Sequence, residues 1–154
     1  MMRGLGCLVL AVTMLVACKR ENAVCYVYRH TPVEGWEQHN VQSFRIDTVR
    51  ESGVYDLRVC LRHTNSYPFQ SLWLLVRQRY LHPDTMMQDT VVCLLIDKQG
   101  NRQGNGISIY QSEYPFRKIY LEKGREGIVT VSHIMRRTIL PGISDVGLLV
   151  RKEE

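Results

Sequence analysis

The sequence lacks an apolar run of the roughly 20 residues that a membrane-spanning helix requires. One apolar stretch extends from Cys7 to Ala17, and it is too short to cross a bilayer as a helix. After it, no segment shows the apolar spacing of three and four residues that is typical of an amphipathic helix. These absences argue against an α-helical membrane domain and against a helical bundle.

Signatures of catalysis are also missing. No serine lies in a Gly-x-Ser-x-Gly elbow, and no pair of cysteines has Cys-x-x-Cys spacing. Gly104-Asn105-Gly106 lacks the third glycine and the strand–helix context of a dinucleotide-binding loop, so we interpret it as a hairpin bend. The histidines never pair at metal-ligand spacing, and they are His30, His39, His63, His82 and His133. We therefore predict no catalytic residue, no cofactor, no metal and no enzymatic activity.

Carboxylates and basic residues point to an ordinary surface. Acidic side chains lie at or near the ends of expected strands, where turns place them in any case, and they are Asp47, Asp56, Asp89 and Asp97. This placement argues against the acid pair of a glycosidase. The formal net charge is +5, but lysine and arginine are dispersed without a block of like charges. We expect neither nucleic-acid binding nor a small-molecule substrate.

The N-terminus has the layout of a bacterial lipoprotein signal. Arg3 supplies a positive charge, the apolar run follows, and Leu15-Val16-Ala17-Cys18 has the form of a lipobox. The prediction is a signal peptide at 1–17 and a lipid on Cys18, which would hold the chain on a membrane. The alternatives are an ordinary cleaved signal and an uncleaved anchor. Residues 18–29 are interpreted as the lipidated anchor and a spacer.

Five cysteines leave three for the mature domain, since Cys7 would leave with the signal and Cys18 would carry lipid. The expected compartment permits disulfides. Cys60 and Cys93 both lie in strand-like runs, so they are either bridged or small buried thiols, and we favour buried thiols. No role follows from the sequence around Cys25.

Alternating apolar and polar residues predict a β domain at 30–154. About eight strands at short, regular spacing are typical of an antiparallel β-sandwich or jelly roll, while an open barrel would show similar patterning. Trp36 is expected to pack on the core. Exposed aromatics on a sheet face remain a candidate glycan platform, although alternation places most of them inside; the candidates are Tyr67, Phe69, Trp73, Tyr110, Tyr114, Phe116 and Tyr120. The expected strands are 41–49, 54–63, 71–81, 89–97, 107–110, 114–122, 128–136 and 145–150.

Three blocks downstream of the lipobox carry a family resemblance. The first is Leu61-Arg62-His63-Thr64-Asn65-Ser66-Tyr67-Pro68-Phe69-Gln70-Ser71-Leu72-Trp73-Leu74. The second is Asp89-Thr90 leading into Leu94-Leu95-Ile96-Asp97-Lys98-Gln99-Gly100 and Gly104-Asn105-Gly106, and the third runs from Met135 to Leu148. Together, and in this order, they resemble the gliding-motility lipoprotein H family (GldH) of Bacteroidota. Gln103 departs from the pattern, since an aromatic is expected there.

This resemblance implies a non-enzymatic envelope lipoprotein that works with the gliding apparatus and its linked secretion system. It implies protein partners in the envelope but not that the organism glides. Within the blocks, Arg62 and Arg136 would make contacts in the fold or meet a partner. The residues after the anchor, Lys19 to Asn22, lack an acidic cluster. We therefore expect an outer-membrane lipoprotein that faces the periplasm rather than the cell surface.

Overall fold

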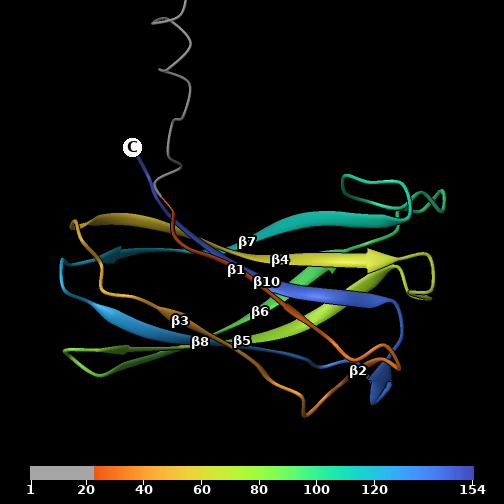
Figure 1. Ribbon diagram of the computed structural model, residues 1–154, viewed down its shortest axis with the longest axis horizontal. Coiled ribbons are helices and arrows are strands. Elements are labelled where there is room, and N and C mark those ends of the chain that lie inside the picture. The colour runs from red at the N-terminus through yellow and green to blue at the C-terminus, as the bar shows by residue number, and fades with distance from the viewer. Residues whose placement is uncertain (1–22) are drawn as a thin grey trace, which may run out of the picture.

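Two four-stranded antiparallel sheets pack face to face in the computed structural model, which describes residues 23–154 (Figure 1). Sheet I has the order β1-β10-β4-β7, with bounds β1 Ala23–His30, β10 Ile143–Lys152, β4 Gly53–Thr64 and β7 Ile109–Leu121. Sheet II has the order β3-β8-β5-β6, with bounds β3 Gln42–Ile46, β8 Glu126–His133, β5 Ser71–Leu81 and β6 Thr85–Leu94. A small pair joins β2 Trp36–Glu37 to β9 Ile139–Leu140. The predicted all-β sandwich is confirmed.

Side-chain alternation explains how the strands bury one face. In β5, Leu72, Leu74 and Val76 are fully buried, while Trp73 and Arg77 on the opposite face are exposed. Central strand β4 is buried on its inner face, and Asp56 and Cys60 on its outer face are buried as well. Trp36 packs on the core as expected, with no exposed surface and its Nε1 donating to the Asn40 carbonyl at 2.8 Å.

The domain begins earlier than position 30. Residues 23–29 were interpreted as spacer, but Ala23–His30 forms β1 and pairs with β10 over its whole length. The spacer prediction is therefore wrong from Ala23 onward. β1 is an edge strand that exposes Tyr26 and Val27 on opposite faces, so it shows no clear alternation.

Two further boundaries differ from the expectation. One strand, β7, replaces the two expected at 107–110 and 114–122, and it accommodates a bulge opposite Leu57 and Arg58. Strand β6 begins at Thr85 rather than Asp89, because β5 and β6 form a tight hairpin around residues 82–84. Otherwise the predicted strands correspond to β3, β4, β5, β8 and β10, with ends shifted by up to three residues.

All three cysteines of the described domain are free and buried, so the favoured interpretation as buried thiols is confirmed. A Cys60–Cys93 bridge is not formed, and the strand faces explain why. Cys60 lies on the outer face of sheet I beside Gly147, whereas Cys93 lies in the core between the sheets. Burial raises the pKa of Cys25 to about 11 and that of Cys60 to about 12.

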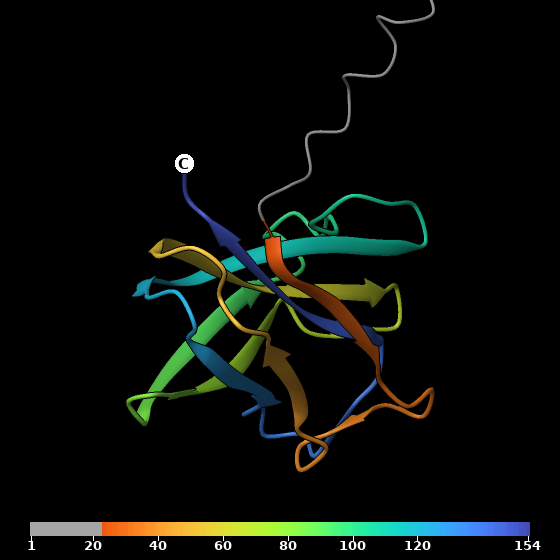
Figure 2. The same ribbon diagram turned by 60° about the vertical axis from the view of Figure 1, so that its left-hand side comes forward.

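The sandwich has two different ends (Figures 1 and 2). We call one the turn end, because the connections 47–52, 82–84 and 122–125 between strands there are short. Ala23 and Lys152 also lie there, side by side at paired ends of β1 and β10. We call the other the loop end, since it carries the long connections 31–41, 95–108 and 134–142, together with the shorter 65–70.

Candidate functional site

Cys18, the predicted lipidation site, lies outside the described residues. The first described residue after it is Ala23, which begins β1 at the turn end. A fully extended chain from Cys18 to Ala23 spans at most roughly 18 Å. Any surface that holds Cys18 therefore lies within that distance of Ala23, at the turn end.

An open depression at the turn end has a volume of about 1130 Å³. Its wall includes an ion pair between Lys152 Nζ and Glu51 at 2.6 Å, and Tyr55 donates its hydroxyl to the Glu51 carbonyl. The lining residues are Ala23, Val24, Asp47, Thr48, Val49, Arg50, Glu51, Tyr55, Lys123, Gly124 and Lys152. Within residues 23–154, no cluster of histidine, cysteine and acidic side chains could hold a metal, here or elsewhere.

Hydrogen bonds of Arg102 and His63 join the connection 95–108 of the loop end to the connection 65–70 and to the end of β4, and we call these contacts the clamp. Arg102 donates from Nη1 to the Tyr67 carbonyl at 2.9 Å and from Nη2 to the Asn65 carbonyl at 2.8 Å. The Nε2 of buried His63 lies 3.1 Å from the Gln103 carbonyl. Because the backbone of Gln103 makes this contact, the departure from the family pattern at this position leaves the clamp intact.

The connection 134–142 packs directly on the connection 65–70. The Thr64 amide donates to the Gly142 carbonyl at 2.8 Å, and Gly142 has a φ of 81°. A Cβ at Gly142 would collide with the Tyr67 amide nitrogen, so only glycine fits. The three blocks that carry the family resemblance therefore meet at the loop end. Its backbone is fixed by mutual hydrogen bonds, which is typical of a pre-formed surface.

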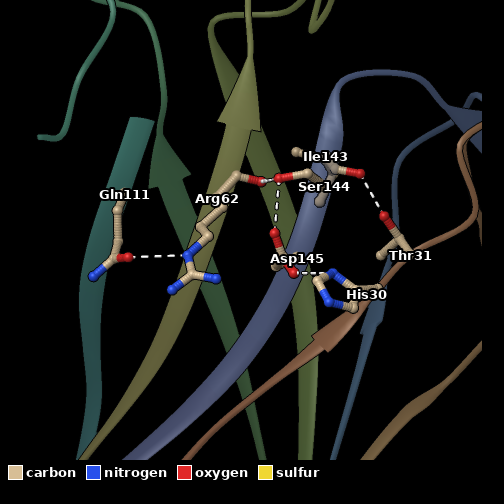
Figure 3. A network of polar contacts seen from close by, with 7 residues as sticks. All are labelled: His30, Thr31, Arg62, Gln111, Ile143, Ser144 and Asp145. Atoms are coloured by element: carbon tan, nitrogen blue, oxygen red, sulfur yellow. Dashed lines mark hydrogen bonds and ion pairs between the residues drawn. The ribbon is translucent and has the colours of Figure 1, made fainter. Parts of the chain in front are cut away.

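A polar network covers the loop end of sheet I (Figure 3). The Asp145 side chain is buried, with 4% of the residue exposed, and its Oδ2 accepts from Ser144 Oγ at 2.9 Å. Its Oδ1 lies 2.5 Å from Nδ1 of the exposed His30. The Thr31 hydroxyl donates to the Ile143 carbonyl and fastens the end of β1 to β10.

This network does not form a catalytic triad. In a triad the serine hydroxyl lies beside Nε2 of the histidine. Here Ser144 instead contacts the carboxylate of Asp145, which His30 also contacts. Arg62 points away from Asp145, toward Gln111 at 3.0 Å (Figure 3), with its guanidinium 4.0 Å from the centre of the Tyr28 ring. The Arg62 contacts are therefore contacts within the fold.

The sequence did not single out the His30–Asp145 pair. The two residues belong to opposite ends of the chain, and only the pairing of β1 with β10 brings them together. An aspartate at the start of an apolar strand was the one available signal, and it was interpreted as a strand boundary.

The aromatic side chains considered for glycan binding do not form a platform. Tyr67 is fully buried, with its ring edge-on to Phe69. Trp73 and Tyr120 are exposed, by 46% and 62%, but they lie on the outer faces of different sheets. Arg136 is exposed, on the 134–142 loop. The described residues contain no helix that is long and apolar enough to cross a membrane.

Comparison with known proteins agrees with the resemblance. The family model described as GldH lipoprotein matches residues 23–150, which is almost the whole described domain. Gliding motility lipoprotein GldH of Flavobacterium johnsoniae is 26% identical over 156 residues, covering 97% of this chain and 96% of that protein. A gliding motility lipoprotein GldH homolog of Christiangramia forsetii is 21% identical over 131 residues, covering 79% and 80%.

Among solved structures, Eiger TNF from S. frugiperda is 10% identical, covers 84% of this chain and 92% of that one, and has a TM-score of 0.37. The extent of the family match, together with the order of the three blocks at the loop end, shows that the chain belongs to the GldH lipoprotein family.

Proposed function

We propose that this protein is an accessory component of the gliding-motility and associated secretion machinery, held at the periplasmic face of the outer membrane by lipid on Cys18. It works as an assembly protein and catalyses no reaction. The lipid keeps the turn end at the membrane and presents the loop end to other envelope proteins. Family membership supports the association with gliding motility.

One observation carries the spatial part of this proposal. Strand β1 starts at Ala23, so Cys18 and the sandwich are separated by residues 19–22 alone. The domain therefore cannot move far from its anchor, and the loop end lies about one strand length, roughly 25 Å, further out. The long connections at that end provide the surface most accessible to a partner.

The lipid is tested by replacing Cys18 with serine in the producing bacterium and labelling cells with an alkyne fatty acid. We expect wild type to be labelled and to sediment with outer membranes, whereas Cys18→Ser is unlabelled and released, with its domain folded. Cys25→Ser is the matched control, because it also removes one thiol but should retain the lipid. Labelled Cys18→Ser protein would contradict the proposal.

The membrane face is tested by protease treatment of intact cells. We expect the domain to be resistant until the outer membrane is permeabilised, since the proposal places it in the periplasm. Digestion of intact cells without lysis would instead support the second candidate, a lipid-anchored surface module that binds glycan or protein. The exposed indole of Trp73 is the observation that favours this second candidate.

A further inference from the structure

Four apolar side chains gather on the outer face of sheet II, in the half nearest the loop end. Trp73 pairs with Val92 across β5 and β6, and the Ile134 amide donates to the Trp73 carbonyl at 2.9 Å from the other side. Leu94 lies next along β6 on the same face. These side chains are 41–50% exposed, and we call them the apolar patch: Trp73, Val92, Leu94 and Ile134.

The other half of the same face is built differently. Arg77 pairs with Gln88 and Thr130, and Arg79 pairs with Met86 and Ile128. Here apolar residues alternate with charged ones, as on an ordinary solvated sheet. Single exposed apolar side chains need no explanation, whereas a contiguous cluster on several neighbouring strands marks an interaction surface.

Two exposed positive charges closely follow the apolar patch in the chain. Met135 Sδ accepts a hydrogen bond from the Trp73 amide, and exposed Arg136 and Arg137 follow it in the chain. Among the described residues, neither arginine makes a side-chain hydrogen bond or ion pair. The acid on the neighbouring β2–β9 pair, Glu37, already contacts His39 at 2.8 Å.

We propose that the apolar patch is the docking surface for an envelope protein whose own apolar surface is bordered by aspartate or glutamate. The inference rests on the proposed role as an assembly protein. A second copy of this chain is a poorer occupant. In a two-fold interface the neighbouring positions of the same sheet face, Arg77, Gln88 and Thr130, would offer no carboxylate to Arg136 and Arg137 of the other copy.

The test uses a photo-crosslinking benzophenone amino acid placed at single positions of the lipidated protein in the producing bacterium. Val92 is the site in the apolar patch, and Met86 is the matched control on the same strand and face, outside the patch. We expect a protein adduct from position 92 and none from position 86. Mass spectrometry should locate the crosslink in an apolar partner segment flanked by acidic residues.

Charge reversal then tests the border. We expect Arg136→Glu with Arg137→Glu to lower the adduct yield from position 92 about tenfold, since two favourable charge contacts become repulsive. Ile128→Glu, which adds an acid to the polar half of the face, should leave the yield unchanged. A yield insensitive to Arg136→Glu with Arg137→Glu would overturn the acidic-border chemistry.

Other adducts overturn the proposal too. A crosslink to this chain's own peptide would identify a second copy as the occupant, and a glycan adduct would make Trp73 a sugar platform. A lipidated, outer-membrane protein with no adduct from position 92 would refute the docking surface and leave the proposed function intact. Failure of lipidation itself would refute the proposed anchoring, whereas an adduct from position 92 to an apolar segment flanked by acidic residues would still support the docking surface.

Discussion

Gly142 and Gly124 have nearly the same backbone conformation in very different surroundings. Their φ angles are 81° and 88°, a region that residues with a Cβ rarely adopt. Around Gly124 a Cβ would meet nothing within 4 Å, whereas at Gly142 it would collide with the backbone of Ser66 and Tyr67. A substitution at Gly124 therefore reports backbone strain alone, whereas one at Gly142 reports backbone strain together with a steric collision at the loop end.

We predict that Gly124→Ala lowers the free energy of unfolding by about 1 kcal/mol, from the left-handed backbone alone. Gly142→Ala should lower it by about 3 kcal/mol or more, because the loop must also move off Tyr67. Urea denaturation of both variants measures the difference. Equal losses would show that the 134–142 loop does not pack tightly on residues 65–70.

Between elements, the two sheets are connected along the β6–β7 side by one ion pair. Arg117 donates from Nε and Nη2 to the two Asp89 oxygens, both at 2.7 Å, and Gln78 Nε2 donates to the same carboxylate at 2.6 Å. Asp89 raises the pKa of the Arg117 guanidinium, chiefly by hydrogen bonding. Tyr114 adds a hydroxyl contact to the Leu94 carbonyl at 2.8 Å.

A double-mutant cycle of Arg117→Met and Asp89→Asn should give a coupling energy of roughly 1–2 kcal/mol, because the pair is two-pronged and partly buried. Arg79 and Asp84 provide the matched control, since they are also two-pronged but their side chains are more than half exposed. Their coupling should stay below about 1 kcal/mol. A coupling no larger at Arg117 would mean that this pair does not join the sheets.

The strands were predicted correctly where one face of the strand is buried in the core, and they were missed where neither face is fully buried. β5 was predicted with its exact bounds, because Leu72, Leu74 and Val76 alternate with outward side chains. β1 was missed because its side chains, apart from Cys25, are exposed or half-buried. The start of β6 was missed for a similar reason, since Met86 and Gln88 are exposed on an edge strand.

The candidate surfaces were less predictable than the strands, because they depend on pairing between distant segments. Trp73 was identified from the sequence as an exposed-aromatic candidate, but its neighbours Val92 and Ile134 follow only from the β6-β5-β8 order. Asp145 and His30 likewise meet only through the β1–β10 pairing. The three resemblance blocks could be read in sequence, whereas their convergence at the loop end could not.

For the molecule as a whole, two fully buried histidines couple stability to pH. Burial lowers the pKa of His63 and of His133 below 6.5, against hydrogen bonds to the Gln103 and Trp36 carbonyls. Protonation is thus easier in the unfolded chain than in the folded one. The stability that these neutral histidines provide is complete above the unfolded pKa of about 6.5 and declines as the pH falls below it.

We therefore predict that the free energy of unfolding is constant near pH 7.5 and falls between pH 6.5 and 5.5. The slope should reach at most about 1.4 kcal/mol per pH unit for each histidine. Denaturant titrations across this range measure it. His133→Gln should reduce the slope, because glutamine can donate to Trp36 without titrating, and an unchanged slope in this variant would exclude His133 as a source.

The position of β1 also determines how the domain would carry a mechanical load. The chain enters β1 at the turn end, and a partner on the loop end would hold the opposite end of the strands. A pull between the two would act along the common axis of the antiparallel strands β1 and β10, at right angles to the hydrogen bonds between them, so these bonds would share the load instead of breaking one after another. This is loading in shear, the geometry that would suit the proposed place of the domain between a membrane and a moving partner.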